Sequence, residues 1–191
     1  IIVLQFNPET LSRTLQVQGV DGEGDRAEAL RLTGPPTETI KLDAELDATD
    51  QLEFPDQNPS TVGLGILPQL DALETMIYPE SGQIETNKQL AQAGVLEIVP
   101  METALTLFVW SANRVLPVRL TEFSITEEFF DQALNPIRAK VSLGMRVLNM
   151  DDLGFTHRGS SIFTTYHKEK ERNAQRNQAG ALAAVVTSLI R

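Results

Sequence analysis

The chain has 191 residues, 26 of them acidic and 16 basic, and a formal net charge of -10 at pH 7. A length of this order corresponds to one domain, or to one domain with an appendage. The absence of cysteine excludes disulfide scaffolds, thiolate zinc sites and cysteine nucleophiles, and the acidic balance opposes sequence-independent binding to nucleic acid or anionic lipid. No apolar stretch reaches the ~20 residues that a membrane-spanning helix needs, and we expect no signal peptide and no membrane insertion.

The first half of the chain contains strand patterns and one helix pattern. Residues Ile1–Phe6 are apolar and β-branched and predict a short strand that ends at Asn7-Pro8. Apolar and charged residues alternate between residues 40 and 47, which predicts a strand with one buried and one exposed face. Apolar residues spaced by three and four between residues 67 and 77 predict one amphipathic helix, and a polar linker follows it.

The second half is dominated by two long strand patterns. Two shorter strands are predicted before them, at residues 95–99 and 103–110. The long patterns cover residues 116–130 and 137–150, and residues 131–136 join them as a hairpin. The alternation in the first arm changes phase between Leu120 and Phe123, which suggests a β-bulge. From about Ser160 the chain becomes helical but polar, and it ends in the apolar segment 179–190.

The residues that usually carry enzymatic chemistry are missing. His157 and His167 do not have the spacing of metal ligands, and the sequence contains no phosphate-binding loop, dinucleotide fingerprint or nucleophile elbow. The acidic run from Asp21 to Asp25 resembles the start of a calcium loop, but its twelfth position is Leu32, where a bidentate carboxylate is needed. We therefore expect no metal, no cofactor and no enzyme.

Three carboxylates on one strand leave an alternative open. Asp43, Glu45 and Asp47 share a face, which is typical of a half-buried strand but is also compatible with a β-rich module that binds a small molecule or a carbohydrate.

The two long arms raise a question of pairing. Long strands in a small domain leave an edge of unpaired N–H and C=O groups that another chain can cover. Identical subunits can add strands head to tail and close into a ring, or a single subunit can close its own barrel, and periodicity does not decide between the two.

Three stretches of sequence resemble the tube-domain family of contractile injection systems, the phage-tail-like particles that drive a rigid tube through a target membrane. They are the opening Phe6-Asn7-Pro8-Glu9-Thr10-Leu11 with Arg13, residues 116–128 (LPVRLTEFSITEE) and residues 134–139 (LNPIRA). The resemblance covers about the first 150 residues and is most specific in the hairpin.

The resemblance implies an α+β, mainly β fold, a tail-tube-like β-sandwich or split barrel with one flanking helix. It implies a tail-tube-like domain at residues 1–150, followed by a C-terminal helical arm at 151–191. It further implies a homo-oligomer, with hexameric rings, assembled in the cytoplasm as a tube initiator or baseplate adaptor. The implied partners are the inner tube protein, the spike hub protein and other baseplate proteins.

The resemblance also implies an assembly interface along the hairpin. Its candidate residues are Arg119, Glu122, Phe123, Asn135, Pro136, Ile137, Arg138 and Lys140. In the C-terminal arm, a short apolar helix behind a polar connector gains little stability alone and is expected to dock on a partner. The candidates for this docking are Leu182, Val185, Val186 and Leu189.

Overall fold

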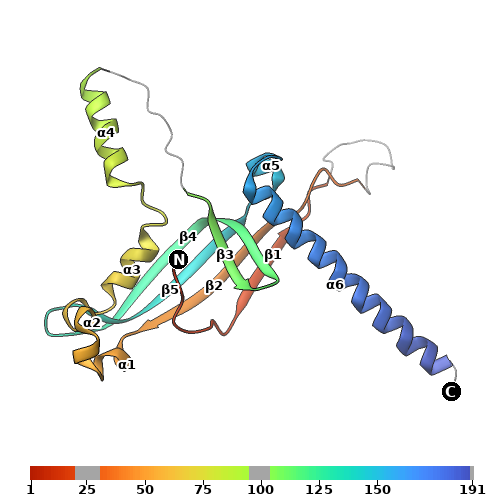
Figure 1. The fold of residues 1–191 in the computed structure, drawn as a ribbon, viewed down its shortest axis with the longest axis horizontal. Coiled ribbons are helices and arrows are strands. Elements are labelled where there is room, and N and C mark those ends of the chain that lie inside the picture. Colours follow the sequence, from red (N-terminus) through yellow and green to blue (C-terminus); the bar gives the residue numbers. More distant parts are fainter. Residues whose placement is uncertain (20–30, 95–103, 190–191) are drawn as a thin grey trace. The chain divides into compact units, whose positions relative to one another are not determined.

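The computed structural model describes residues 1–19, 31–94 and 104–189, with side chains as far as residue 178. The elements, in chain order, are β1 (Leu11–Gln16), β2 (Thr37–Asp47), α1 (Thr49–Leu52), the 3-10 turn η1 (Pro55–Gln57), α2 (Pro59–Leu64), α3 (Leu67–Glu74), α4 (Ser81–Gln92), β3 (Thr106–Ser111), β4 (Arg114–Phe130), β5 (Pro136–Val147), α5 (Met150–Leu153) and α6 (Arg158–Leu189) (Figure 1). The α+β class is therefore confirmed.

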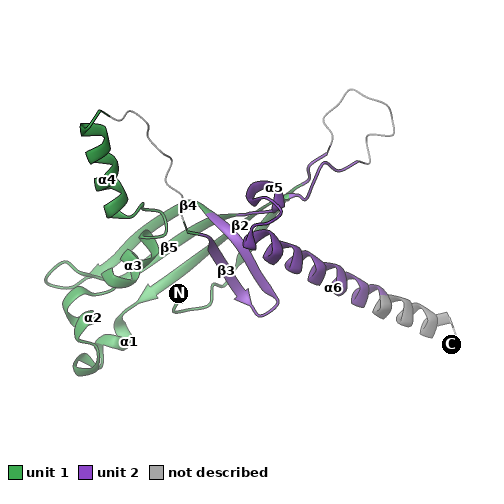
Figure 2. Ribbon diagram, turned by 45° about the horizontal axis from the view of Figure 1, so that its top comes forward, with its two compact units in different colours: residues 1–16, 37–104, 120–146 green, residues 17–36, 105–119, 147–191 purple. Residues whose placement is uncertain are grey.

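The five strands form one antiparallel sheet in the order β1-β2-β5-β4-β3. β5 thus lies between β2 and β4, and the short strands β1 and β3 are the outermost members. The chain separates into two compact units, which are coloured separately in Figure 2. Unit 1 comprises residues 1–16, 37–104 and 120–146, and unit 2 comprises residues 17–36, 105–119 and 147–191.

The core of unit 1 is built on the paired strands β2 and β5. Their buried residues face each other across the register, which places apolar side chains together on one face of the sheet. These pairs are Ile40 with Met145, Leu42 with Leu143, Ala44 with Val141, and Leu46 with Ala139. Helix α3, which the leucine spacing predicts, contributes the buried residues Leu70 and Leu73. The alternation of residues 40–47 is therefore confirmed as a strand with one buried face.

One charged residue interrupts the buried face of β2. Glu38 is 3% exposed, and Arg13 of β1 places its Nη2 atom 2.6 Å from the Glu38 carboxylate. A buried carboxylate is tolerated when a cation and hydrogen bonds compensate for its lost hydration. Arg13 therefore ties the outer strand β1 to the core of unit 1.

Unit 2 joins the hairpin of β3 and the first residues of β4 to the start of α6. Leu116 and Val118 are buried in this unit, as are Phe163 and Tyr166 of α6. Gly159 lies so close to Leu153 that a Cβ atom at this position would approach the Leu153 Cδ1 atom to 2.5 Å. Asn149 caps α5 through a capping box with Asp152. The helical arm that the sequence predicts is α6, and no helix in the described residues is long and apolar enough to cross a membrane.

The prediction of a strand at Ile1–Phe6 is wrong. The segment has no strand pairing, and its contact with β2 is made by a side chain. Gln5 Nε2 donates to the Asp47 carbonyl oxygen at 2.8 Å, while Gln5 Oε1 accepts from the Asp47 N–H at 2.9 Å. The backbone bends at Gln5, Phe6 and Glu9, so it does not run alongside β2 in the regular way that strand pairing needs.

The region after β2 is more helical than the sequence predicts. One helix was expected there, but α1, α2 and α4 accompany α3. Helix α4 replaces the predicted polar linker, because glutamine, glutamate, lysine and alanine favour a helix even where no apolar stripe is present. The predicted strand at 95–99 and the acidic run from Asp21 to Asp25 lie outside the described residues. The predicted strand at 103–110 is confirmed as β3.

Candidate functional site

The polar face of unit 1 carries the three carboxylates that the sequence singled out. Opposite residues on β2 and β5 have complementary side chains: Asp47 faces Arg138, Glu45 faces Lys140, and Asp43 faces Ser142. Cross-strand pairs of opposite charge stabilise a sheet when they lie directly opposite each other. The prediction that Asp43, Glu45 and Asp47 share one face is therefore confirmed, and each lies opposite a cation or a hydroxyl group.

Arg138 is the centre of this charged surface. Its Nη2 atom lies 2.6 Å from the Asp47 Oδ2 atom, and its Nε atom lies 3.1 Å from the Glu45 Oε1 atom. Hydrogen bonds from the Thr49 side chain and backbone, together with Arg138, hold the pKa of Asp47 below its ordinary value. The same contact with Asp47 raises the pKa of Arg138. Arg138 is thus engaged within its own chain.

The other candidate charges are also paired within the chain. Glu122 lies 2.6 Å from Lys41 Nζ, and Lys140 Nζ lies 3.2 Å from Glu128 Oε1. These are exposed pairs, which contribute about 0 to 1 kcal/mol each. The sequence left open whether these residues contact a neighbouring subunit or face water. The intrachain pairs favour the second interpretation for Glu122, Arg138 and Lys140.

The absence of a side chain at Gly144 lets the Lys41 side chain reach Glu122 on β4. Lys41 lies opposite Gly144 in the register, and a Cβ atom at Gly144 would lie 2.8 Å from the Glu122 Cβ atom and 3.4 Å from the Thr121 Oγ1 atom. The exposure of β4 changes phase at the predicted place: Leu120 and Phe123 are half-buried, whereas Thr121 and Glu122 between them are both exposed. Strict alternation would place Leu120 and Phe123 on opposite faces. The change of phase is therefore present in the structure, and a β-bulge as its cause stays a prediction.

The end of the hairpin is attached to the helices that follow β2. Asp131 Oδ1 accepts hydrogen bonds from the N–H groups of Ala133 and Asn135, both at 2.8 Å. The Asn135 side chain and these N–H groups lower the pKa of Asp131. Asn135 Nδ2 also donates to the Gly63 carbonyl oxygen at 3.1 Å. The predicted hairpin at residues 131–136 is confirmed, and it is fixed by contacts inside unit 1.

Pro136 and Ile137 anchor the start of β5 to the same helices. Pro136 is fully buried, and its carbonyl oxygen accepts from the Ile66 N–H at 2.9 Å. The Ile137 carbonyl oxygen accepts from the Ala48 N–H at 2.9 Å. Gly65 has a φ of 60°, and a Cβ atom there would lie 2.1 Å from the Pro136 oxygen. Asn135, Pro136 and Ile137 therefore have a structural role, whatever further role they have in assembly.

The outer side of β4 is the most open part of the sheet. β3 pairs with β4 only as far as Val118, and among the described strands none lies on that side of residues 119–130. The candidate residues Arg119 and Phe123 belong to this stretch, the first exposed and the second half-buried. At the opposite end of the sheet order, β1 pairs only with β2. Unit 1 thus has two unpaired edges in the part of the chain that the structure describes.

The two edges have matching faces. On β1, Ser12 and Thr14 lie on the polar face opposite Lys41 and Thr39, whereas Leu11 lies on the apolar face opposite Leu42. On β4, Glu122 and Glu128 belong to the polar face through their lysine partners. Alternation then places Ser124 and Thr126 on the polar face and the half-buried Phe123 and Ile125 on the apolar face. A strand such as β1 has the pattern that would extend the sheet at β4.

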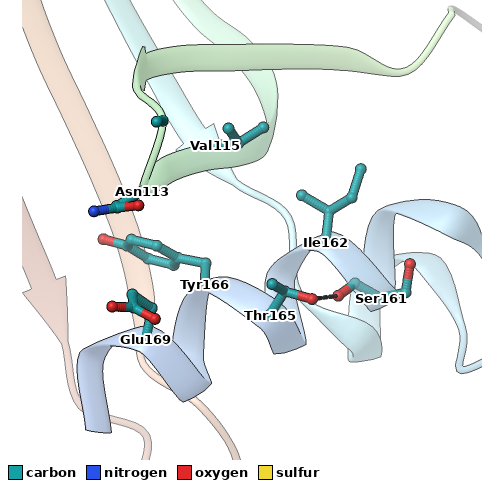
Figure 3. Close-up of a pocket in the computed structure, with 8 residues that line it drawn as sticks. Asn113, Val115, Ser161, Ile162, Thr165, Tyr166 and Glu169 are labelled. Atoms are coloured by element: carbon teal, nitrogen blue, oxygen red, sulfur yellow. Dashed lines mark hydrogen bonds between the residues drawn. The ribbon is translucent and has the colours of Figure 1, made fainter. Parts of the chain in front are cut away.

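A shallow groove of about 320 Å³ lies in unit 2, between the turn that joins β3 to β4 and the start of α6 (Figure 3). Its lining residues are Ala112, Asn113, Val115, Ser161, Ile162, Thr165, Tyr166 and Glu169. Glu169 is paired on its own helix with Arg172 at 3.1 Å and with Arg176 at 3.8 Å. The lining does not include Asp43, Glu45 or Asp47, so this groove gives no support to a ligand site built on those carboxylates.

The remaining candidates are metal ligands and the docking residues of the C-terminal arm. In the described part of the chain, no group of three histidine, aspartate or glutamate side chains is arranged to hold a metal ion. The docking candidates Leu182, Val185, Val186 and Leu189 lie on α6, but their side chains are outside the described residues.

Sequence analysis missed an apolar cluster at the end of the hairpin. Phe129, Phe130 and Leu134 are 66%, 50% and 78% exposed. Phe129 and Leu134 have φ angles of 54° and 66°, which bulky residues rarely adopt. The sequence signal that could have found this cluster is the pair Phe129-Phe130, which lies at the end of a strand pattern and beside a turn, where polar residues are usual.

Comparison with known proteins gives no family for the chain, since no family model and no curated protein matches it.

Proposed function

We propose that this chain is a structural, ring-forming component of a contractile injection system, a tube initiator or baseplate adaptor between the spike hub and the inner tube. The resemblance of the opening segment and the hairpin to the tube-domain family suggests this role. The observation that carries the proposal is the pair of sheet edges in unit 1 that no described strand covers, at β1 and along residues 120–130 of β4. The proposed role is non-enzymatic and needs no cofactor.

Strand direction supports a contact between identical subunits. Neighbouring strands in the order β1-β2-β5-β4 alternate in direction, so β1 of a second copy that follows β4 in the same orientation runs antiparallel to it. The sheet therefore continues from copy to copy with one type of pairing. Such a head-to-tail contact closes into a ring when the rotation between copies allows it. A hexamer is the ring that the resemblance implies.

The charges on the polar face of the sheet favour a role as a channel wall that borders water. In the proposed ring, the charged surface of Lys41, Glu45, Asp47, Arg138 and Lys140 lines the central channel. These charges are neutralised within each chain, so the face needs no partner to compensate for them. The buried face of the same strands then lies toward the outside of the ring, beneath the helices of each subunit. The proposed assembly takes place in the cytoplasm and involves neither nucleic acid nor insertion of this chain into a membrane.

The test compares an edge variant with a matched control. Thr126→Lys places a lysine on the open edge of β4, where natural proteins use lysine to block strand addition. Thr156→Lys makes the same change at an exposed position of unit 2. Light scattering and electron microscopy of the protein with its hub and tube proteins should show rings for the wild type and for Thr156→Lys, and a strong loss of rings for Thr126→Lys. A wild-type protein that stays monomeric and binds neither partner contradicts the proposed function.

A further inference from the structure

The apolar cluster at the end of the hairpin is largely uncovered by the described residues of its own chain, although the guanidinium carbon of Arg138 lies 5.9 Å from the centre of the Phe129 ring. Phe129, Phe130 and Leu134 are all at least half exposed. The positive φ angles of Phe129 and Leu134 are strained for residues other than glycine, and such strain persists only where the surrounding structure enforces it. The Asp131 hydrogen bonds and the Asn135 contact with Gly63 provide this enforcement. The hairpin thus holds an exposed apolar surface in a fixed position.

A second uncovered apolar surface is the N-terminal segment. Ile1, Val3 and Phe6 are exposed, and residues 1–6 contain no charged side chain. The strand register and the hydrogen bonds of Gln5 also fix where the segment runs. Leu11 lies opposite Leu42 in the register, and Gln5 is bonded to Asp47, so six residues of the segment advance alongside five residues of β2. Residues 5–11 therefore run beside the end of β2, with bends at Gln5, Phe6 and Glu9 and without the backbone pairing of a strand.

The proposed contact between copies brings these two surfaces together. A slip of one residue in strand pairing exchanges the two faces, so only every second register keeps polar residues with polar residues. One such register places Ser12 of one copy opposite Ser124 of the next, and Leu11 opposite Ile125. Continuing by the same count, Phe6 lies opposite Phe130. A shift by two residues still leaves the segment at the end of the hairpin.

We propose that the N-terminal segment of one copy packs on the hairpin end of a second copy, with Phe6 covering Phe130. The inference rests on the proposed function, because the antiparallel joining of β1 to β4 is what directs the segment there. Its occupant is a second copy of this chain. The side chains that the segment brings to the contact carry no charge. They therefore add no charge repulsion between subunits that each carry a net charge of -10. It would bury aromatic anchors of the kind that dominate protein interfaces.

Cross-linking tests the proposal directly, because the chain has no native cysteine. Two forms of the full chain, distinguished by a tag, each carry one cysteine, so a cross-link between the two forms joins two subunits. One mixture combines Phe6→Cys with Phe130→Cys. A second mixture combines Ser12→Cys with Ser124→Cys and reports on the sheet edges alone. Both are assembled and treated with a short flexible bismaleimide, which tolerates a shift of two residues in the register.

The two mixtures separate failure of the inference from failure of the proposed function. We expect mixed dimers in both. Cross-links at Ser12 and Ser124 without cross-links at Phe6 and Phe130 would overturn the inference and leave the joined sheet intact. Cross-links at Phe6 and Phe130 alone would keep the arm contact and overturn the joined sheet. Absence of both, or absence of any oligomer, would overturn both proposals.

A second measurement uses variants that change only apolar surface. Phe6→Ser and Phe130→Ser should each raise the protein concentration needed for assembly by about tenfold, because each removes apolar area that the contact would bury. Phe155→Ser removes an exposed aromatic side chain from unit 2, outside the proposed contact, and serves as the control. An unchanged assembly midpoint in both Phe6→Ser and Phe130→Ser would contradict the contact.

Discussion

The two arms of the long hairpin look alike in the sequence but differ in the structure. β5 has β2 on one side and β4 on the other, and its alternate residues Ala139 and Val141 are completely buried. β4 shares its inner side with β5, but beyond Val118 its outer side faces no strand in the described part of the chain. Of the two arms, only β4 is therefore available for pairing with another chain, whereas β5 holds unit 1 together.

The candidate interface residues divide in the same way. Residues at the start of β5, such as Asn135, Pro136 and Ile137, are used inside unit 1. Arg119 and Phe123 lie on the open part of β4. Variants of Asn135, Pro136 and Ile137 should therefore change folding as well as the proposed assembly, and a variant of the exposed Arg119 should change the proposed assembly alone.

The largest effect is expected from a charge in the centre of β5. Val141→Lys buries an ammonium group at a position that is 0% exposed, and it should cost at least about 4 kcal/mol of unfolding free energy or prevent folding. Thr126→Lys on β4 should change stability by no more than about 0.5 kcal/mol. Urea unfolding of both variants measures the contrast, and equal losses would contradict the difference between the arms.

A smaller but still substantial loss is expected from Gly65→Ala. The new Cβ atom would collide with the Pro136 carbonyl oxygen, and alanine disfavours the positive φ of this position. We expect a loss of about 2–4 kcal/mol in unfolding free energy. Gly63→Ala is the matched control, because nothing lies within 4 Å of its new Cβ atom. If the two alanine variants unfold at the same urea concentration, the attachment of β5 to the helices is weaker than described.

Asn135→Ala should have an intermediate effect. It removes the hydrogen bonds from Nδ2 to the Gly63 carbonyl oxygen and to Asp131 Oδ2, and we expect a loss of about 1–2 kcal/mol. Thermal unfolding measures the loss, and unaltered stability in Asn135→Ala would show that the anchor is dispensable.

Shortening the hairpin tip at Asn135 and Pro136 should impair the proposed assembly and also destabilise unit 1. A tip that served assembly alone could be shortened with no change in thermal unfolding.

The smallest effect is expected from acid. The pKa of Asp47 is held below its ordinary value of 3.8 by Thr49 and Arg138, so its contribution to stability is present above about pH 4 and is lost as pH falls through the lowered pKa. Solvent screening keeps this contribution below about 1 kcal/mol. Urea unfolding between about pH 5 and pH 2 should show a shallower decline for Asp47→Asn than for the wild type. Parallel declines would exclude Asp47 as a source of the pH dependence.

Much of the fold was accessible from the sequence because alternation reports burial directly. The period of two in residues 40–47 predicted β2, and the leucine spacing predicted α3. The strand predicted at Ile1–Phe6 failed because pairing depends on a neighbour as well as on residue type. Helix α4 was missed because it has no apolar stripe, so only propensity signals it.

Residue types and their spacing are enough to identify the strand formers, the polar faces and the hairpin between two long arms. The folded chain is needed to show that β5 is central, that Arg138 and Lys140 have partners within the chain, and that no described strand covers the outer side of β4 beyond Val118. Periodicity is a local property, because it depends on neighbours two or four residues away. Strand order and ion pairing depend on residues such as Asp47 and Arg138, which are far apart in the chain and meet only when it folds.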